Sequence, residues 1–339
     1  MTSPIRLLDL GEVSPLRSQA VYHGLAEASA PDSPDTIVLL RPASPYFCVG
    51  FHQNPAQELD LPWCRQHGYP VLHRKIGGGT VYLDRNQLFY QCIVHRSRAP
   101  LRVNTIYEKF LAAPAAALRA LGLRATLEEP NEIEVGGKRI AGTGGGQIGE
   151  AMVVTGNILF DFNYNVMARA WRAPSKPFRR LAREGLRRYL TTLRRELRDC
   201  PRAETLTEMI ARAYAETLGA PLLPGSLTAP ELRAIEAVEA ELASDAFVLD
   251  GGGRREPGLK IARGVYVFEG RAKRADVRIS LRVRQGVIDA LAVRGSSPRA
   301  GQRLVGRRIA ALESGAEGKN PADIVGELLA AGGPSEWVT

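Results

Sequence analysis

Short apolar runs bounded by Pro, Gly, Asn and Asp recur along the first hundred residues, and this pattern is typical of β-strands. It predicts strands at residues 37–40, 47–50, 71–73 and 88–94. Between residues 103 and 123 the apolar positions recur every three or four residues, and Gly122 closes the pattern. That spacing predicts a long amphipathic helix, so we expect the first half of the chain to be a sheet-rich region that carries this helix.

The strand pattern resumes after this helix. It predicts strands at 133–135, 139–141 and 151–160, with the glycine cluster 142–146 between the last two. Residues 205–218 show helical periodicity, and residues 221–230 are rich in Pro, Gly and Ser, which is typical of a linker. Beyond the linker the pattern predicts a helix at 231–242, strands at 264–269, 277–283 and 287–293, and a helical end. We therefore expect two domains, residues 1–222 and a small α+β domain at residues 227–339.

The composition narrows the class of protein. No apolar run is long enough to span a bilayer, and residues 1–10 lack the basic and apolar regions of a signal peptide, so we expect a cytoplasmic protein without membrane contact. The four cysteines are scattered without the pair spacing of a metal site, and we expect them to be structural. They are Cys48, Cys64, Cys92 and Cys200.

The net charge of +9 indicates an acidic partner. Nucleic acid is not indicated, because the chain carries no helix-turn-helix, finger or RNA-binding signature and only 6% aromatic residues. Cations concentrate between residues 171 and 200, where they predict either a solvated basic face or a surface for an acidic protein. These cations are Arg172, Lys176, Arg179, Arg180, Arg183, Arg187, Arg188, Arg194, Arg195 and Arg198.

The segment from His73 to Asp84 reads HRKIGGGTVYLD and places three consecutive glycines between two predicted strands. Without Cβ atoms the backbone can take positive φ, and a ligand can lie directly against its amide groups. Arg74 in the adjoining strand can supply a fork of donors to a carboxylate or phosphate. A hairpin turn is the alternative explanation of the three glycines.

A second segment, residues 131–142, carries the basic pair Lys138 and Arg139 on a tight turn between two predicted strands. The chain has neither the Gly-Lys-Ser/Thr ending of a Walker loop nor a GxGxxG that opens a helix. Two glycine-lined hairpins that each carry a cation suit an acyl adenylate, whose tail they can cover and whose phosphate they can neutralise. Basic residues on surface hairpins are the alternative interpretation.

Together these segments resemble the lipoate-protein ligase family, within the wider superfamily of biotin and lipoate protein ligases. The order and spacing agree over about residues 5–220, and the tail from Leu227 resembles the accessory domain of the longer ligases. Four elements carry the resemblance: an Asn-Gln-Asn-like turn at residues 49–55, the arginine and triple glycine from Arg74 to Asp84, an Asn-Asp-Ile-like element at residues 131–133, and a Gly-Thr-Leu-Leu-like strand at residues 155–159.

The resemblance implies an α+β fold, with a catalytic domain of mixed sheet similar to class II synthetases and a small α+β accessory domain. It also implies a reaction that uses ATP and Mg²⁺. Lipoate or octanoate would be activated as the acyl adenylate and then transferred to a lysine of an acidic lipoyl-carrier protein.

Carried over by motif, the resemblance implies a set of site residues. Arg139, with Lys138 in reserve, is expected at the reacting phosphate and carbonyl, and Asp84 and Glu132 near Mg²⁺. The residues expected to bind the acid and the nucleotide are Arg74, Gly77, Gly78, Gly79, Thr80, Val81, Asn131, Gly142 and Thr155.

The chain departs from the family pattern at an important position. The family lysine directly before the Ile-Ala-Gly step is Arg139 here, and Lys138 stands one place earlier. Because neighbours on a strand point to opposite faces, we expect Arg139 to face the site. Further departures put the identity of the acid in doubt; they are Leu83, Asn86, Gln87 and Gln91.

Two other functions remain open. Octanoyl transferases that work from acyl carrier protein need a nucleophilic cysteine, but no cysteine lies between Ile140 and Asp161, where such a family places it, and Cys92 lies on an apolar strand. ATP-independent octanoyl or lipoyl transfer is therefore the first alternative. A non-catalytic binder of lipoate or its adenylate is the second, because the family lysine is replaced.

Overall fold

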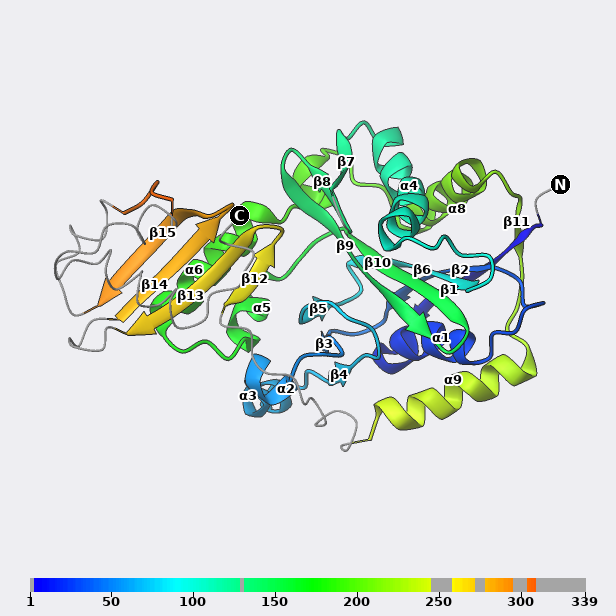
Figure 1. Ribbon diagram of the computed structural model, residues 1–339, viewed down its shortest axis with the longest axis horizontal. Coiled ribbons are helices and arrows are strands. Elements are labelled where there is room, and N and C mark those ends of the chain that lie inside the picture. Colours follow the sequence, from blue (N-terminus) through cyan, green and yellow to red (C-terminus); the bar gives the residue numbers. More distant parts are fainter. Residues whose placement is uncertain (1–2, 129–130, 245–257, 272–277, 295–303, 309–339) are drawn as a thin grey trace. The chain divides into compact units, whose positions relative to one another are not determined.

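The computed structural model describes residues 3–128, 131–244, 258–271, 278–294 and 304–308 (Figure 1). The chain divides into two compact units. Unit 1 comprises Met1–Asn163 and Thr191–Arg254, and unit 2 comprises Tyr164–Leu190 and Arg255–Thr339.

Unit 1 is built on an eight-stranded sheet with the order β11-β1-β2-β6-β10-β9-β8-β7. Strand β1 pairs in parallel with β11 and β2, while the pairs from β2 to β7 are antiparallel, so the sheet is mixed. The predicted α+β class with a mixed sheet is confirmed. The strands are β1 Ile5–Val13, β2 Thr36–Pro42, β6 Gln87–His95, β7 Ala125–Glu128, β8 Glu132–Val135, β9 Lys138–Ile148, β10 Ala151–Leu159 and β11 Leu222–Pro224.

A second, three-stranded sheet with the order β4-β3-β5 lies within the same unit. Its middle strand pairs in parallel with β4 and antiparallel with β5. The three glycines therefore do not form a hairpin turn between neighbouring strands, because the loop that contains them passes from one side of β3 to the other. The strands are β3 Tyr46–Val49, β4 Val71–His73 and β5 Val81–Leu83.

Helices cover both faces of the large sheet, since each face carries its own hydrophobic core. Helices α4 and α8 pack together and contribute to one core, whereas α1 and α9 pack together and contribute to the other (Figure 1). The helices of unit 1 are α1 Pro15–Glu27, α2 Pro55–Glu58, α3 Leu61–Gln66, α4 Val103–Ala120, α7 Leu193–Glu196, α8 Ala203–Leu218 and α9 Ala229–Leu242. No helix in the described part of the chain is both long enough and apolar enough to cross a bilayer.

The glycine cluster 142–146 lies inside strand β9 and not between two strands, which corrects the sequence prediction. Each of these glycines is paired with a residue of β10, from Gly142 opposite Asn157 to Gly146 opposite Val153. The strand pattern was hidden because glycine has no side chain to alternate between the faces. Glycine within a strand often marks a site where another segment or a ligand approaches the backbone.

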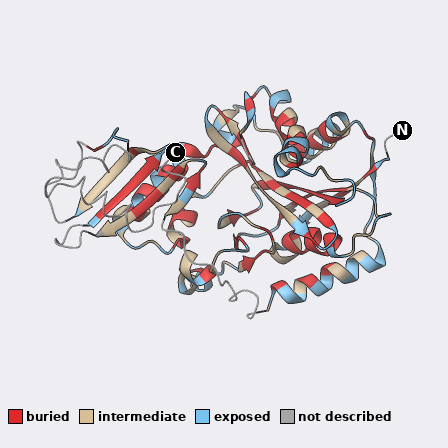
Figure 2. Ribbon diagram, viewed as in Figure 1, coloured by how far each residue is buried: buried red, intermediate tan, exposed pale blue. Residues whose placement is uncertain are grey.

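Unit 2 is an antiparallel sheet, β12-β13-β14-β15, with helix α6 packed on it. The buried residues of α6 include Phe178, Leu181 and Leu186, and Gly185 allows the close approach of Ile261 and Arg282. Figure 2 shows buried residues along α6 and along the middle strands of this sheet. The elements are α5 Tyr164–Ala170, α6 Lys176–Tyr189, β12 Leu259–Ala262, β13 Val265–Arg271, β14 Arg278–Arg284 and β15 Val287–Arg294.

The boundary between the compact units does not follow the predicted domains 1–222 and 227–339. Residues 164–190 group with the C-terminal sheet because the apolar face of α6 packs on that sheet. Helix α9 groups with unit 1 because it packs on α1. The predicted helical end of the chain lies outside the described residues.

Candidate functional site

The loop that carries the three glycines passes over the end of strand β3. A Cβ atom at Gly50, directly after β3, would lie 1.9 Å from the carbonyl oxygen of Gly78. Gly78 itself has φ +105°, which side chains rarely allow. Glycine is therefore required at both positions for the loop to lie this close to β3.

Arg74 holds this loop in shape. Its guanidinium donates hydrogen bonds to the carbonyl oxygens of Gly77 (3.0 Å), Gly79 (2.8 Å) and Cys48 (3.3 Å), and the residue is 8% exposed. The sequence predicted that Arg74 binds a carboxylate or phosphate. In this structure its donors fold the glycine loop, and a direct contact with a ligand stays a prediction.

Strand β9 lies against the other side of the loop. A Cβ at Gly144 would lie 3.3 Å from the carbonyl oxygen of Gly77, and one at Gly146 would lie 3.6 Å from the side chain of Ile76. At Gly77 and Gly79, by contrast, a Cβ would meet nothing within 4 Å. The backbone at these two glycines is therefore open to a ligand.

Polar side chains lie next to Gly142 and Gly144 on the same face of the large sheet. In the register, Glu132 and Asn157 flank Gly142, and Thr155 lies opposite Gly144, so these side chains share one face. Asn157 donates to the side-chain oxygen of Gln87, which donates in turn to the Tyr82 carbonyl (3.0 Å). Gly142 and Gly144, which form the glycine strip of β9, are thus bordered by the polar side chains of Glu132, Asn157 and Thr155.

Arg139 lies beside these polar side chains. Gly136 and Gly137 both have positive φ and form the two-residue turn between β8 and β9, so the tight turn predicted within residues 131–142 is present, with Lys138 and Arg139 directly after it in β9. A bulge then places one extra residue in β9, because Ala141 pairs with Ile133 whereas Arg139 pairs with Glu134.

The side chain of Arg139 reaches back along this face. Its Nη1 lies 3.3 Å from the Glu132 carboxylate, and its Cδ lies 4.0 Å from where a Gly142 Cβ would be. Arg139 thus shares the glycine face, while Lys138 pairs with Val135 beside the turn. The arrangement agrees with the orientation expected for Arg139, and the catalytic role of either cation stays a prediction.

Asn131 and Thr80 also take part in the local hydrogen bonding. The Asn131 amide donates to the Thr143 carbonyl (2.6 Å) and also bonds Tyr107, whose pKa is raised by burial. The Thr80 hydroxyl donates to the side chain of Gln53 (2.9 Å), which also accepts from the Gly50 amide. Both residues therefore shape the loops beside the glycine strip, and neither Gln53 nor Tyr107 was singled out from the sequence.

The two acids expected near Mg²⁺ differ in their surroundings. Asp84 accepts from the Asn86 amide (2.8 Å) and bonds the Tyr82 hydroxyl, so it stabilises the turn after β5. Glu132 is 4% exposed and lies on the glycine face with Arg139. No group of three or more His, Cys, Asp or Glu in the described residues could hold a metal ion by itself.

Mg²⁺ is commonly held by one or two carboxylates together with substrate phosphates, so the site fits this ion only if phosphate completes its coordination. Glu132 is the better candidate for the protein ligand because of its position beside the glycines. The assignment of Asp84 to the metal stays a prediction.

None of the cysteines is placed as an activated thiol. Cys48, Cys64 and Cys92 are at most 1% exposed, and burial raises the pKa of Cys92 to about 12. Burial also raises the pKa of Cys48, although the nearby Arg74 opposes the shift. Cys200 is half-buried, and burial raises its pKa against the opposing charge of Arg194. An acyl-enzyme thiol needs the opposite, a lowered pKa in an accessible position.

The chain is similar in sequence and in fold to several known proteins. The model of the lipoyl protein ligase A/B catalytic domain matches residues 14–215. An octanoyltransferase LipM from Kyrpidia tusciae is 28% identical over 268 residues, covering 71% of this chain and 97% of that protein. Lipoate–protein ligase 2 from Staphylococcus aureus is 24% identical over 181 residues, covering 52% of each chain. The bipartite lipoate protein ligase of Thermoplasma acidophilum has the same fold, with a TM-score of 0.69 at 19% identity over 75% of this chain and 99% of that one.

Proposed function

Because the chain belongs to the lipoyl protein ligase A/B catalytic-domain family, we propose that it activates lipoate or octanoate with ATP and transfers the acyl group to a lysine of a carrier protein. Relatives of the family are named both as ligases and as octanoyltransferases, which supports acyl transfer to protein as the common activity. The choice between free acid with ATP and a preformed thioester depends on the site of this chain.

The proposal is carried by one contrast: a cation, Arg139, lies beside the glycines, whereas none of the four cysteines is placed as an activated thiol. Arg139 lies beside Gly142, two residues before Gly144, which meets the glycine loop, and at this position it can offset the negative charge of a phosphate. Burial raises the pKa of the Cys48, Cys92 and Cys200 thiols, and Cys64 is fully buried. A route that needs a cationic phosphate site and no thiolate fits these residues better than an acyl-enzyme route.

In the first half-reaction the carboxylate of the acid attacks the α-phosphorus of ATP, the acyl–phosphate bond forms and pyrophosphate leaves. The backbone at Gly77 and Gly79 would lie against the bound molecule, and Arg139 would stabilise the charge that develops on the phosphate. When bound, Mg²⁺ would further offset this charge, with Glu132 as its candidate protein ligand.

In the second half-reaction the neutral ε-amine of the acceptor lysine attacks the acyl carbon. The amide bond forms, AMP leaves with the electrons of the broken acyl–oxygen bond, and the proton that the amine loses passes to solvent. The same Arg139 would stabilise the phosphate of the leaving AMP.

The acceptor that we propose is a small acidic domain that docks on unit 2. The apolar face of α6 is buried on the sheet, and its other face exposes Lys176, Arg180, Arg183 and Arg187 at spacings of one turn. A row of exposed cations attracts an acidic protein surface and speeds its encounter. The buried apolar face of the helix argues against insertion into a membrane.

The proposal is tested with an apo lipoyl domain as acceptor and two alternative donors, free lipoate or octanoate with ATP and Mg²⁺, or octanoyl acyl carrier protein without ATP. We expect the mass of the acceptor to increase only with the free acid and ATP, and equally well with the Cys200→Ser variant. Transfer from the acyl carrier protein without ATP would contradict the proposal.

Octanoyl transfer is the second candidate, favoured by the relative named octanoyltransferase, which aligns over 97% of its length. In that case Cys200 is the thiol to test, because it is the most exposed of the four cysteines. Loss of ATP-independent transfer in Cys200→Ser would establish this function.

A further inference from the structure

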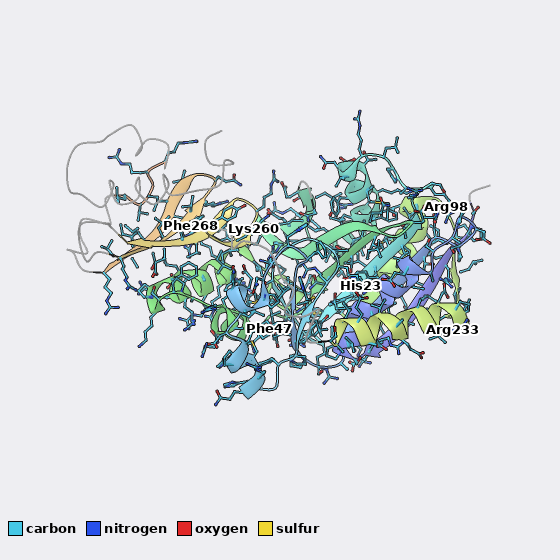
Figure 3. All side chains as sticks on the ribbon, turned by 60° about the horizontal axis from the view of Figure 1, so that its bottom comes forward. His23, Phe47, Arg98, Arg233, Lys260 and Phe268 are labelled. Atoms are coloured by element: carbon cyan, nitrogen blue, oxygen red, sulfur yellow. The ribbon has the colours of Figure 1, made fainter. Side chains whose placement is uncertain are left out.

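The backbone of the glycine loop is tied to helix α1 by a buried histidine. The Lys75 amide, one residue after Arg74, donates to Nε2 of His23 (3.0 Å), and Nδ1 of His23 bonds the Gln19 carbonyl (2.7 Å). A carbonyl can only accept, so Nδ1 carries the proton and Nε2 is the acceptor. His23, labelled in Figure 3, is fully buried and stacks on Tyr22.

This histidine stays neutral. Burial lowers the pKa of His23 to about 3, and the nearby charges of Lys75 and Arg74 act in the same direction, against the hydrogen bond to Gln19. The acceptor for the Lys75 amide is therefore present throughout the neutral pH range.

The side chain of Lys75 forms a second tie. Its Nζ lies 2.7 Å from the Glu27 carboxylate on α1 and 2.6 Å from the Glu241 carboxylate in the last turn of α9. These two carboxylates raise the pKa of Lys75 even though burial opposes the shift. Two helices thus hold the residue that joins Arg74 to the glycines.

Helix α9 is fixed firmly enough to serve as an anchor. Its residues Ile235, Val238 and Leu242 are fully buried, and a Cβ at Gly24 would lie 2.6 Å from the Ile235 backbone. Thr228 and Glu231 form a capping box at its start, Glu231 also pairs with Arg6, and Arg17 pairs with Glu239. The helix lies beyond residues 14–215, which match the family model.

We propose that His23 and Lys75 are positioning residues for the glycine loop and that Glu241 makes the last turn of α9 part of the acid-binding site. The identity of the ligand, lipoate or octanoate, rests on the proposed function, whereas the positioning of the loop does not. When the tie to Lys75 is lost, the loop should move away from the geometry that presents Gly77 and Gly79 to the acid.

The first experiment measures hydrogen exchange of the peptide that contains residues 76–83 in the full-length protein without ligands. In Lys75→Met we expect exchange at least about 10-fold faster, and in Glu241→Gln a smaller increase. Lys75→Arg should restore most of the protection. Glu236→Gln, a change of an exposed glutamate on the same helix, is the matched control and should exchange as the wild type does. Unchanged exchange in Lys75→Met would overturn the proposal.

The second experiment measures lipoate and octanoate binding by calorimetry without ATP. We expect Lys75→Met to weaken binding by about 10-fold while the melting temperature changes by no more than about 2 °C, because the tie acts on geometry. Wild-type affinity in Lys75→Met would contradict the proposal. If the wild type binds neither acid, the proposed function fails, and the exchange experiment still decides the role of the tie.

Discussion

The two compact units carry opposite net charge. Unit 1 has 22 Lys and Arg against 26 Asp and Glu, whereas unit 2 has 23 against 10, so the positive charge of the chain belongs to unit 2. The cations of unit 1 near the glycines are individually held, as Arg74 is by carbonyl oxygens and Arg139 by Glu132. In unit 2, an exposed face of α6 carries a row of four cations, Lys176, Arg180, Arg183 and Arg187. The first arrangement suits one small anion in a fixed place, and the second suits attraction of a large acidic surface.

The largest effect should follow from removing the cation at the glycine face of unit 1. Arg139→Ala should lower acid-dependent pyrophosphate release by about 100-fold, because it removes the charge that we propose to stabilise the reacting phosphate. Lys138→Ala, the neighbouring change, should have a much smaller effect. Steady-state rates of both variants check this, and the reverse ranking would show that the β8–β9 hairpin presents Lys138 instead.

A pair of glycine substitutions separates the folding of the loop from its binding. Gly78→Ala should destabilise the protein by about 1–3 kcal/mol, since its φ is +105° and the new Cβ would lie 2.7 Å from Arg74. Gly79→Ala meets open space and should change the free energy of unfolding by less than about 1 kcal/mol while it weakens acid binding. Urea unfolding and calorimetry measure the two quantities. Equal acid affinity in wild type and Gly79→Ala would place the ligand elsewhere.

Reversing the charge on α6 should weaken only the docking of the acceptor protein. Lys176→Glu combined with Arg183→Glu should raise the KM for the carrier protein by about 10-fold and reduce its salt dependence, because it removes long-range attraction. Pyrophosphate release without acceptor should not change. Arg124→Glu, at an exposed position of unit 1, is the control. An equal rise in KM in the control would mean that net charge, and not the α6 face, governs docking.

A further effect concerns stability against acid. The pKa of His23 is about 3 in the folded protein and near 6.5 unfolded, so the unfolded state binds the extra proton between these values. Stability is retained above about pH 6.5 and is lost by at most about 1.4 kcal/mol for each pH unit as the pH falls toward 3. Urea unfolding between pH 7 and 4.5 should show a shallower loss in His23→Gln than in the wild type. Parallel curves would show that His23 does not titrate in this way.

The sequence predicted local features well where a few adjacent residues suffice. The Gly136–Gly137 turn and the long helix α4 were predicted because turn residues and apolar periodicity are local signals. Helix α1 was missed, since residues 18–26 are buried on all sides and include Ser18, Gln19 and His23, so no amphipathic pattern exists.

Features that depend on distant segments could not be predicted. Arg74 was expected to bind a ligand, and only the fold brings the Cys48 carbonyl and the loop carbonyls around its guanidinium. The contact of Lys75 with Glu241 joins residues 166 positions apart, beyond the predicted domain boundary. The packing of α6 on the C-terminal sheet could likewise not be predicted, because the dominant signal in the sequence of this helix is its many charges.

The most direct test of ATP-dependent activation is pyrophosphate release from the purified protein with ATP and Mg²⁺, comparing lipoate, octanoate and biotin in the absence of an acceptor. Without acceptor, only the first half-reaction can contribute. We predict release that depends on lipoate or octanoate and is absent with biotin. No release with any of the acids would contradict acyl-adenylate formation and favour transfer from a carrier-bound acyl group or binding without catalysis.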